Sequence, residues 1–389
     1  MNDSIIAIDE QGLIDFTRDI VRTPSLSREE EKVARTIAAK MKELGFDLVR
    51  IDSMFNVTGF IYGEERSPEL LFNGHIDTVP PSNIADPFSG AITDGGKYGV
   101  SGMVLEGRGA CDNKGAVASM IYAAGALRRH GVPFRKTFVM TAVAREEMAN
   151  GEGIMKVLGE EDVRTARMAV SGEATNMNVH IGHRGKLEFT VRVQGRTSHA
   201  SNPEQGINAV YKMSDFIQDL RKDYVMPSHR VLGDCTFAVI DIVSGPGRLG
   251  PITPDWCEIA LDRRYLPEES AASVTSEIES LIDRRRSLDP EFQAVVELVK
   301  DFPPLYCPED EPVVALTRQS RESVIGVPGK IDVWKFGVDG TFIQKSGIPC
   351  VGFGPGNELH AHTPHDHVPI EQLLASCRVY ADIIRRACC

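Results

Sequence analysis

The stretch LLFNGHIDT, residues 70–78, gives the clearest indication of the fold of this chain. Its consecutive apolar residues are typical of a strand that is buried on both faces of a sheet. The strand leads directly into His75 and Asp77, an imidazole and a carboxylate two residues apart. Because ligands in α/β sheets bind beyond the carboxyl ends of the strands, we expect a binding site at this point.

Similar strands alternate with helical patterns through the first half of the chain. Residues 9–45 predict two helices separated by a break. Ser27, with Glu30 three residues later, is expected to cap the second of these helices, and Gly45 to end it. Further on, the predicted elements are a helix at 114–131 and strands at 137–144 and 166–174. This alternation predicts an α/β domain whose sheet is covered by helices.

The pattern changes near residue 183. The segments that alternate polar and apolar residues with period two are 186–195, 234–244 and 256–266. Such alternation is typical of antiparallel strands with one exposed face. Helical patterns lie between them at 208–222 and 272–286. We therefore predict an α+β domain, residues 183–300, inserted into a first domain that comprises residues 1–182 and 301–389.

Composition and charge exclude several classes of partner. The 389 residues are 42% hydrophobic and 25% charged, as in soluble globular proteins. The formal net charge of −12 argues against nucleic acid or an anionic membrane as the main partner. No apolar stretch approaches the ~20 residues that a membrane span requires.

The cysteines and the N-terminal residues bear on location. The eight cysteines are scattered and include no Cys-x-x-Cys pair, so we expect reduced and mostly buried thiols. Cys388 and Cys389 are expected to be loose at the end of the chain. Residues 1–16 lack the basic and apolar segments of a signal peptide. These features predict a cytoplasmic protein.

Acidic or imidazole side chains follow several of the apolar runs. In chain order they are His75, Asp112, Glu146 with Glu147, Glu173, and the histidines from His360 to His367. If they met at one edge of the sheet, the carboxylates would disfavour one another's ionisation unless a cation neutralised them. A mixed set of imidazoles and carboxylates suits zinc or a similar divalent metal. A carboxylate shared by two metals would make this a two-metal site.

Two neighbouring side chains would then have supporting roles. Asp77 can accept the second ring N–H of His75 and so orient that ligand. The adjacent Glu146 and Glu147 can divide the work, one binding a metal while the other transfers a proton from water to a leaving amine.

Each stretch has an ordinary explanation when it is taken alone. An Asp after a strand is usually a helix cap or a turn, and a Glu pair is often a solvated helix face. The histidines of residues 360–367 could form an exposed, adventitious metal binder. The metal-site hypothesis therefore depends on the occurrence of all the stretches, in order, along one chain.

The ordered motifs also carry a family resemblance. GHIDTVP, GACDNKG, EE, SGEAT, TSHAS and AHTP resemble the co-catalytic zinc peptidase family of acetylornithine deacetylase, succinyl-diaminopimelate desuccinylase, zinc aminoacylase and glutamate carboxypeptidase. The resemblance implies a catalytic α/β domain with a mixed sheet and two divalent metal ions, with zinc expected and cobalt or manganese as alternatives. It also implies that the inserted α+β domain is a lid through which a homodimer forms.

The same resemblance implies a role for each polar residue. The implied ligands are His75 and Glu173 for one metal, Glu147 and His362 for the other, and Asp112 as the bridge. The implied general base is Glu146, and Asp77 is the partner that orients His75. The family often has a cis peptide after the bridging residue, here between Asp112 and Asn113. His362 is chosen because AHTPHD resembles the family's Ala-His-x-x-acid-acid stretch, although His365 stands at the first acidic position.

The lid contributes three further candidates. His199 resembles the histidine that reaches the active site of a neighbouring subunit and polarises the scissile carbonyl, and Asn208 in the same segment is expected to bind substrate. Arg264 resembles a clamp for a substrate carboxylate, with an ion pair inside the lid as the alternative. Pro251 and Thr341 stand where relatives carry Asn and desuccinylases carry Arg, which argues against a succinyl-diaminopimelate substrate.

The sequence therefore predicts a dimeric metal-dependent hydrolase that acts on a small-molecule amide. Candidate substrates are an N-acyl amino acid, a dipeptide or a related carbamoyl compound. One alternative is a non-catalytic, metal-containing binding protein of the same fold, although the Glu pair and His199 argue against it. Another is a structural dimer that holds no metal tightly.

Overall fold

The computed structural model describes residues 6–247 and 250–389. Residues 1–5, which form part of the segment used to judge a signal peptide, lie outside the described residues. The chain divides into two compact units. The larger unit comprises Met1–Gly182, Tyr306–Trp334 and Val338–Cys389, and the smaller unit comprises His183–Leu305 and Lys335–Gly337.

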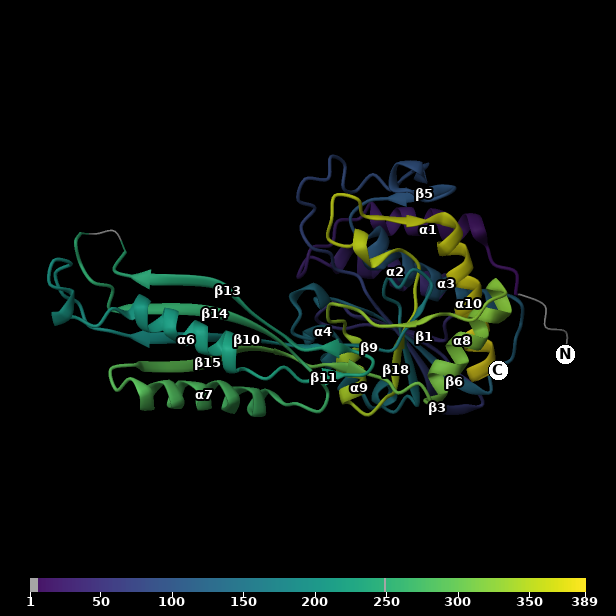
Figure 1. Ribbon diagram of the computed structural model, residues 1–389. Helices are drawn as coiled ribbons and strands as arrows, with labels where there is room; N and C mark the ends of the chain where they lie inside the picture. Colours follow the sequence, from purple (N-terminus) through teal and green to yellow (C-terminus); the bar gives the residue numbers. More distant parts are fainter. Residues whose placement is uncertain (1–5, 248–249) are drawn as a thin grey trace. The chain divides into compact units, whose positions relative to one another are not determined.

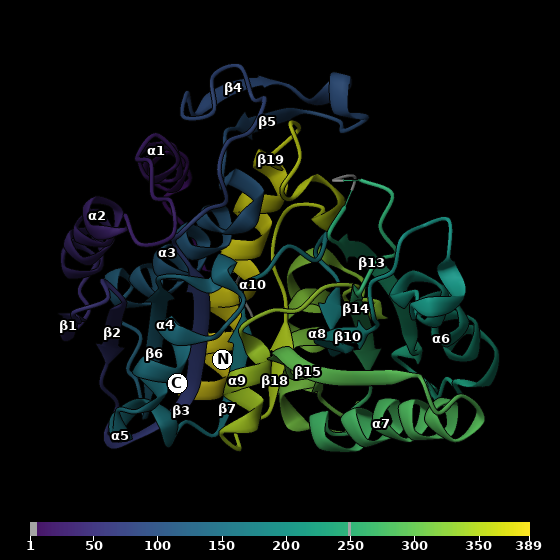
Figure 2. The same ribbon diagram turned by 90° about the vertical axis from the view of Figure 1, so that its left-hand side faces the viewer.

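The larger unit is built on a mixed sheet with strand order β1–β2–β6–β3–β7–β18–β8–β17 (Figures 1 and 2). Its central strands run parallel: β6 (Lys136–Val143), β3 (Glu65–His75), β7 (Met168–Ser171) and β18 (Cys350–Gly352). The outer strands are β1 (Leu48–Ile51), β2 (Val57–Ile61), β8 (Val179–His180) and β17 (Ile331–Asp332). The predicted α/β fold with a mixed sheet is confirmed.

Helices cover both faces of this sheet, which explains the consecutive apolar residues in its strands (Figures 1 and 2). On one face lie α3 (Gly115–Arg129), α8 (Pro312–Ile325) and α10 (Ile370–Cys388). On the other lie α4 (Glu152–Leu158) and α9 (Gly340–Lys345), and the short α5 (Glu161–Arg164) follows α4. The N-terminal helices are α1 (Glu10–Val21), which contacts α3, and α2 (Glu31–Glu43), which packs on β1 and β2.

A small antiparallel sheet joins two distant parts of the larger unit. Its strands are β4 (Ala91–Asp94), β5 (Met103–Glu106) and β19 (His367–Pro369), in the order β19–β5–β4. His367 pairs with Glu106 and Val368 with Leu105. This pairing brings the histidine-rich loop before β19 to the loop that leads into α3.

The smaller unit is an antiparallel sheet with two helices packed on one face. The strand order is β13–β14–β10–β15, with β10 (Gly185–Gln194), β13 (Thr236–Gly245), β14 (Trp256–Tyr265) and β15 (Gln293–Phe302). Its helices are α6 (Ala209–Asp223) and α7 (Ala271–Leu288), and its shorter strands β11 (Ser228–His229) and β12 (Gly233–Asp234). The inward residues of β10 and β14, such as Val191 and Ile259, form its core with Phe216 and Ile278 from the helices. Two further short strands, β9 (Gly182–His183) and β16 (Leu305–Tyr306), pair with each other.

Two local predictions were wrong. Ser27 does not cap α2: its hydroxyl donates to Asp77 Oδ2 at 2.7 Å, and no side chain caps that helix. Cys388 is not loose, because α10 continues to that residue and buries its thiol. The other expectation for the cysteines is confirmed, since all eight are free and only Cys389 is partly exposed. Among the described residues, no helix is long and apolar enough to cross a membrane.

Candidate metal centre

The carboxyl ends of the parallel strands bring the predicted ligands to one edge of the larger sheet. His75 is the last residue of β3, and Glu173 lies two residues beyond the end of β7. Glu146 and Glu147 follow β6 in a single 3₁₀ turn, Glu146–Met148. Because these strands are parallel neighbours in the sheet, their C-terminal residues necessarily converge.

The remaining two candidates come from loops. Asp112 lies in a π-helical turn, Ala110–Lys114, directly before α3. The peptide bond between Asp112 and Asn113 is cis, as the family resemblance implied. His362 lies between the 3₁₀ turn Glu358–His360 and β19, with a positive φ of 60°.

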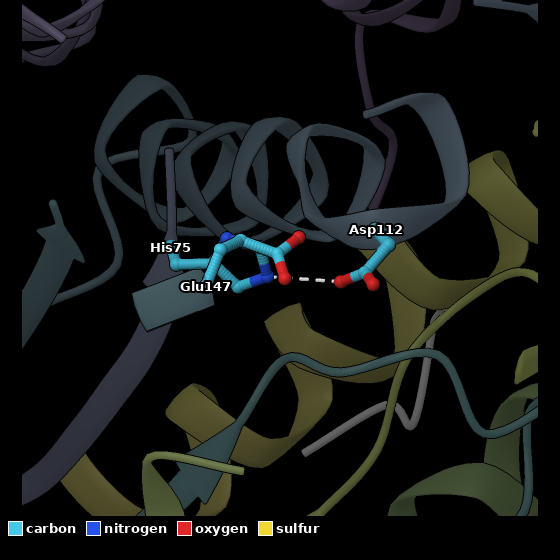
Figure 3. A group of neighbouring side chains, drawn as sticks. All are labelled: His75, Asp112 and Glu147. Carbon is cyan, nitrogen blue, oxygen red and sulfur yellow. Dashed lines mark hydrogen bonds and ion pairs between the residues drawn. The ribbon is translucent and has the colours of Figure 1, made fainter. Parts of the chain in front are cut away.

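Asp112 stands at the centre of the group. Its Oδ1 is 2.9 Å from Nε2 of His75, and its Oδ2 is 3.2 Å from Nε2 of His362. The same His362 nitrogen is 2.8 Å from Oε2 of Glu147, and Glu173 Oε2 is 4.0 Å from the His75 nitrogen. Figure 3 shows His75, Asp112 and Glu147 turned toward one another; each offers a ligand atom within 4.8 Å of the others.

The donor set suits divalent metal ions, which these imidazoles and carboxylates would hold. His75 contacts one oxygen of the Asp112 carboxylate and His362 the other, while Glu173 lies beside His75 and Glu147 beside His362. Glu173 Oε1 is buried and has no hydrogen-bond partner among the described residues. A buried carboxylate oxygen without a partner is costly, and a bound cation would satisfy it.

The His75 ring is already oriented for ligation. Its Nδ1 lies 3.0 Å from the backbone carbonyl oxygen of Asp77, so this nitrogen carries the proton and donates it. In the neutral ring the lone pair is therefore on Nε2, the nitrogen that faces Asp112 and Glu173.

The pKa values of the buried carboxylates are shifted in opposite directions. Burial raises the pKa of Glu173 to about 8 and also raises the pKa values of Glu146 and Glu147. Burial alone would raise the pKa of Asp112 too, but hydrogen bonds from His362 and His75 hold it below its ordinary value. Without a cation the carboxylates cannot all be ionised, which is the electrostatic condition that divalent metals relieve.

The histidines respond to the same carboxylates. Hydrogen bonds to Asp112 and Glu147 raise the pKa of His362 to about 10. Burial disfavours the charged form of His75, but hydrogen bonds to Asp112 and Asp77 outweigh it and raise the pKa of that ring. The raised pKa values favour protonated rings, so metal binding by these histidines would compete with protons.

Asp77 makes further contacts besides the one expected with His75. Its carboxylate is 3.5 Å from Nδ1 of His75, and its own carbonyl oxygen is nearer, at 3.0 Å. The carboxylate also accepts the backbone N–H groups of Glu146 and Glu147 at 3.0 and 3.2 Å and the hydroxyl of Ser27. It therefore fixes the turn that presents the glutamate pair.

Three predicted residues belong to the smaller unit. His199 is exposed, and its Nδ1 lies 2.7 Å from the Ser201 hydroxyl. Asn208 caps α6, with its side-chain oxygen accepting two backbone N–H groups. Arg264 forms an ion pair with Asp262 at 2.8 Å, which is the contact that the alternative explanation expects.

Sequence reasoning missed two buried acidic residues near the ligands. Asp339 has both carboxylate oxygens buried without a hydrogen-bond partner among the described residues, and burial raises its pKa to about 7. Asp366 contacts the loop that precedes Asp112. Asp339 stands at the start of a helix, where an acidic cap is common. Asp366 stands at the second acidic position of the AHTPHD motif, but the motif did not indicate its contacts with the loop before Asp112.

Comparison with known proteins identifies the family. A sequence model described as peptidase family M20/M25/M40 matches residues 71–386. "Uncharacterized protein YgeY" of Escherichia coli strain K12 is 31% identical over 95% of this chain and 92% of its own length. A succinyl-diaminopimelate desuccinylase of Thioalkalivibrio sulfidiphilus is 25% identical over 96% of this chain and 98% of its own.

A solved structure agrees with the fold. The Bacillus subtilis protein YXEP, described as a dinuclear metal-binding peptidase of the M20 family, has a TM-score of 0.73 and 17% identity. The match covers 97% of this chain and 98% of that one. Since the family model spans most of the sequence and YgeY aligns along nearly all of it, the chain belongs to peptidase family M20/M25/M40.

Proposed function

We propose that the protein is a metal-dependent hydrolase that cleaves the amide bond of an N-acyl amino acid, a dipeptide or a related carbamoyl compound. The observation that carries this proposal is a second glutamate, Glu146, beside the Asp112-centred donor set. A protein that only bound metal would need the donors but no proton acceptor next to them. Membership of a peptidase family and relatives named as hydrolases support the same conclusion.

The chain's own residues suit a water-mediated hydrolysis. Two divalent ions, for which zinc is the expected metal, would polarise the scissile carbonyl and make a water acidic when bound. Glu146 takes a proton from the attacking water and then delivers it to the leaving amine. Because the N–H of Glu146 is held by Asp77, this base stands on a fixed turn rather than on a mobile loop.

The substrate contacts are proposed to come from the smaller unit. His199 would polarise the carbonyl, Arg264 would bind a substrate carboxylate, and Asn208 would contact the substrate beside them. The support is the resemblance of their segments to the family motifs. Arg264 would have to exchange its ion pair with Asp262 for the substrate carboxylate. Because one relative is named as a desuccinylase, an N-succinyl amino acid should be included among the N-acyl substrates tested, although Thr341 argues against it.

We also propose a homodimer formed through the smaller unit, the lid, and a cytoplasmic location. Support for the dimer comes from β13, an edge strand whose Ile240 and Ile242 are 58% and 52% exposed. Exposed apolar side chains on an unpaired strand edge favour pairing with another chain. Support for the location comes from the eight free cysteines.

Amine release from a panel of N-acyl amino acids, carbamoyl amino acids and dipeptides would test the function. Protein loaded with zinc, cobalt or manganese is expected to cleave at least one class, and a chelator is expected to abolish the cleavage. The variant Glu146→Gln should bind metal as the wild type does, while its turnover falls by ~10²–10⁴-fold. Metal binding without turnover on any substrate would favour the non-catalytic binding protein, and near-normal turnover of Glu146→Gln would refute the assigned base.

A further inference from the structure

One buried carboxylate, Asp366, connects the two loops of the candidate centre. Its Oδ2 accepts the backbone N–H of Gly109 at 2.7 Å, and its Oδ1 accepts that of Cys111 at 2.9 Å. Arg108 Nη1 completes the contacts, 2.9 Å from Oδ2. Cys111 directly precedes Asp112, and Asp366 follows His362 by four residues, so this side chain spans the distance between two ligand-bearing loops.

These contacts are fully removed from water. Asp366 is 3% exposed and Arg108 is 1% exposed. Hydrogen bonds from N–H groups to a buried carboxylate are short and strong, and a replacement that cannot accept them leaves donors unpaired. The Nε and Nη2 atoms of Arg108 have no hydrogen-bond partner among the described residues. The contact of Nη1 with Asp366 is therefore the main polar interaction of that guanidinium.

The connection is not needed to hold the polypeptide segments together. The backbone pairing of β19 with β5, His367 with Glu106 and Val368 with Leu105, already joins them. What the Asp366 carboxylate adds is contact with residues 108–111, beyond the end of β5, where the chain turns toward Asp112. Its contacts therefore fix the conformation of the loop that carries Asp112.

His362 depends on this arrangement more than the other ligands do. Its side chain is 51% exposed, whereas the His75 and Glu173 side chains are 1% and 4% exposed. Packing therefore holds His75 and Glu173 in place, but it does not hold His362. The set Asp112, Glu147 and His362 includes a residue from each of the two loops that Asp366 connects. The set His75, Asp112 and Glu173 includes a residue from only one of them, the loop before α3.

We propose that Asp366 is a positioning residue that sets Asp112 relative to His362 and thereby determines the affinity for the second metal ion. This inference rests on the proposed function, because it presumes that the donor set binds two metals. Loss of a partner that orients ligands typically lowers metal affinity by about 10–100-fold. The loss is expected to be selective, because the first metal would keep two ligands that packing holds in place.

The test compares Asp366→Asn with Glu69→Gln. Asn is isosteric with Asp, but it presents an NH₂ group to one of the N–H donors. Glu69 is a matched control, since it is 9% exposed and pairs with Lys136 at 2.9 Å, six residues before His75 in β3. Stepwise titration of metal-free protein with Zn²⁺ in a chelator-buffered solution gives both affinities, and the visible absorbance of Co²⁺-loaded protein reports the ligand geometry.

The expected result is a 10–100-fold weaker second metal in Asp366→Asn, with the first metal changed by less than ~3-fold, and a Glu69→Gln protein that matches the wild type. Wild-type affinity for the second metal, or equal weakening of both metals, would overturn the inference. If Asp366→Asn does not fold, Asp366→Ser removes the N–H contacts without opposing them and carries the same expectation. Wild-type protein that binds no metal would instead refute the proposed function itself.

Discussion

At the scale of single residues, Asp77 supports the glutamate turn as well as the histidine beside it. It is fully buried, and its carboxylate collects two backbone N–H groups and one hydroxyl. The N–H groups belong to Glu146 and Glu147, the proposed base and a proposed ligand. The position of both therefore depends on one carboxylate that touches neither of their side chains.

Replacing Asp77 with Asn should disturb this turn. The amide NH₂ would oppose one of the two backbone N–H donors, while the amide oxygen could still accept from the other. We therefore expect kcat to fall by ~10–100-fold and metal to be held more weakly. Ser27→Ala is the matched control, because it removes only the hydroxyl donor and should change kcat by less than ~3-fold. Turnover and metal content of the two variants would be measured together. Equal effects of both substitutions would show that the backbone contacts do not matter.

Single residues also mark where sequence reasoning stops. The placement of His75, Glu147 and Glu173 at one edge of the sheet could be predicted because each stands at or just beyond the end of a recognisable buried strand. Asp366 and Asp339 could not, because their importance lies in contacts with residues far away in sequence. The Ser27 cap was a plausible local pattern, but Asp77, fifty positions away, competes for the same hydroxyl.

At the scale of elements, strand β13 differs from its neighbours in the smaller unit. It lies at the edge of the sheet, and Val239, Ile240, Ile242 and Val243 are all exposed. Burying apolar side chains of this size contributes roughly 1.5–3 kcal/mol each when they are fully covered. In an isolated monomer these side chains stay in water, and this burial free energy is not gained.

Lysines on this edge should therefore separate the proposed dimer. We expect the double variant Ile240→Lys, Ile242→Lys to be monomeric by sedimentation, with a folded larger unit that still binds metal. The control carries lysines at Val295 and Val299 on β15, the opposite edge of the same sheet, where the side chains are 67% and 61% exposed. Dissociation of the control alone would assign the interface to β15, and a monomeric wild type would refute the dimer.

Long and well-buried elements could be predicted from the sequence, whereas short ones could not. Strands β3, β6 and β10 and helices α3 and α10 were all recognisable from period or apolar content. The small sheet β19–β5–β4 was not, because its strands have only three or four residues, and glycines flank β4 and β5. Strands so short carry too few alternating positions to show a pattern, and only the fold of the rest makes them pair.

At the scale of the whole molecule, the proposed function requires contributions from both compact units. The proposed metal ligands belong to the larger unit, and the proposed substrate contacts, His199, Asn208 and Arg264, belong to the smaller one. The sequence predicts this division because the hydrophobic period changes from buried strands to half-exposed ones near residue 183. It does not predict which copy of the smaller unit serves which metal site.

Mixing inactive variants would answer that question. Glu146→Gln and His199→Ala homodimers should each have low activity. If His199 acts on the neighbouring subunit, a mixed dimer contains one site with both residues intact, and random exchange restores roughly a quarter of wild-type activity. A mixture of Glu146→Gln with Glu147→Gln is the control, since both changes lie in the same turn and in the same unit. Activity that never rises above that of the separate variants would confine His199 to its own chain.

The order of the ligands along the chain has a consequence for how the protein is made. His75, Asp112, Glu147 and Glu173 are all synthesised before the smaller unit, whereas His362 and the central strand β18 come after it. A growing chain on the ribosome therefore carries an acidic, incomplete set of donors and a sheet that lacks one of its middle strands. If the donors bind two metals as proposed, loading with both would have to wait until translation is nearly finished. A chain cut short before residue 350 would lack β18 and the proposed second site.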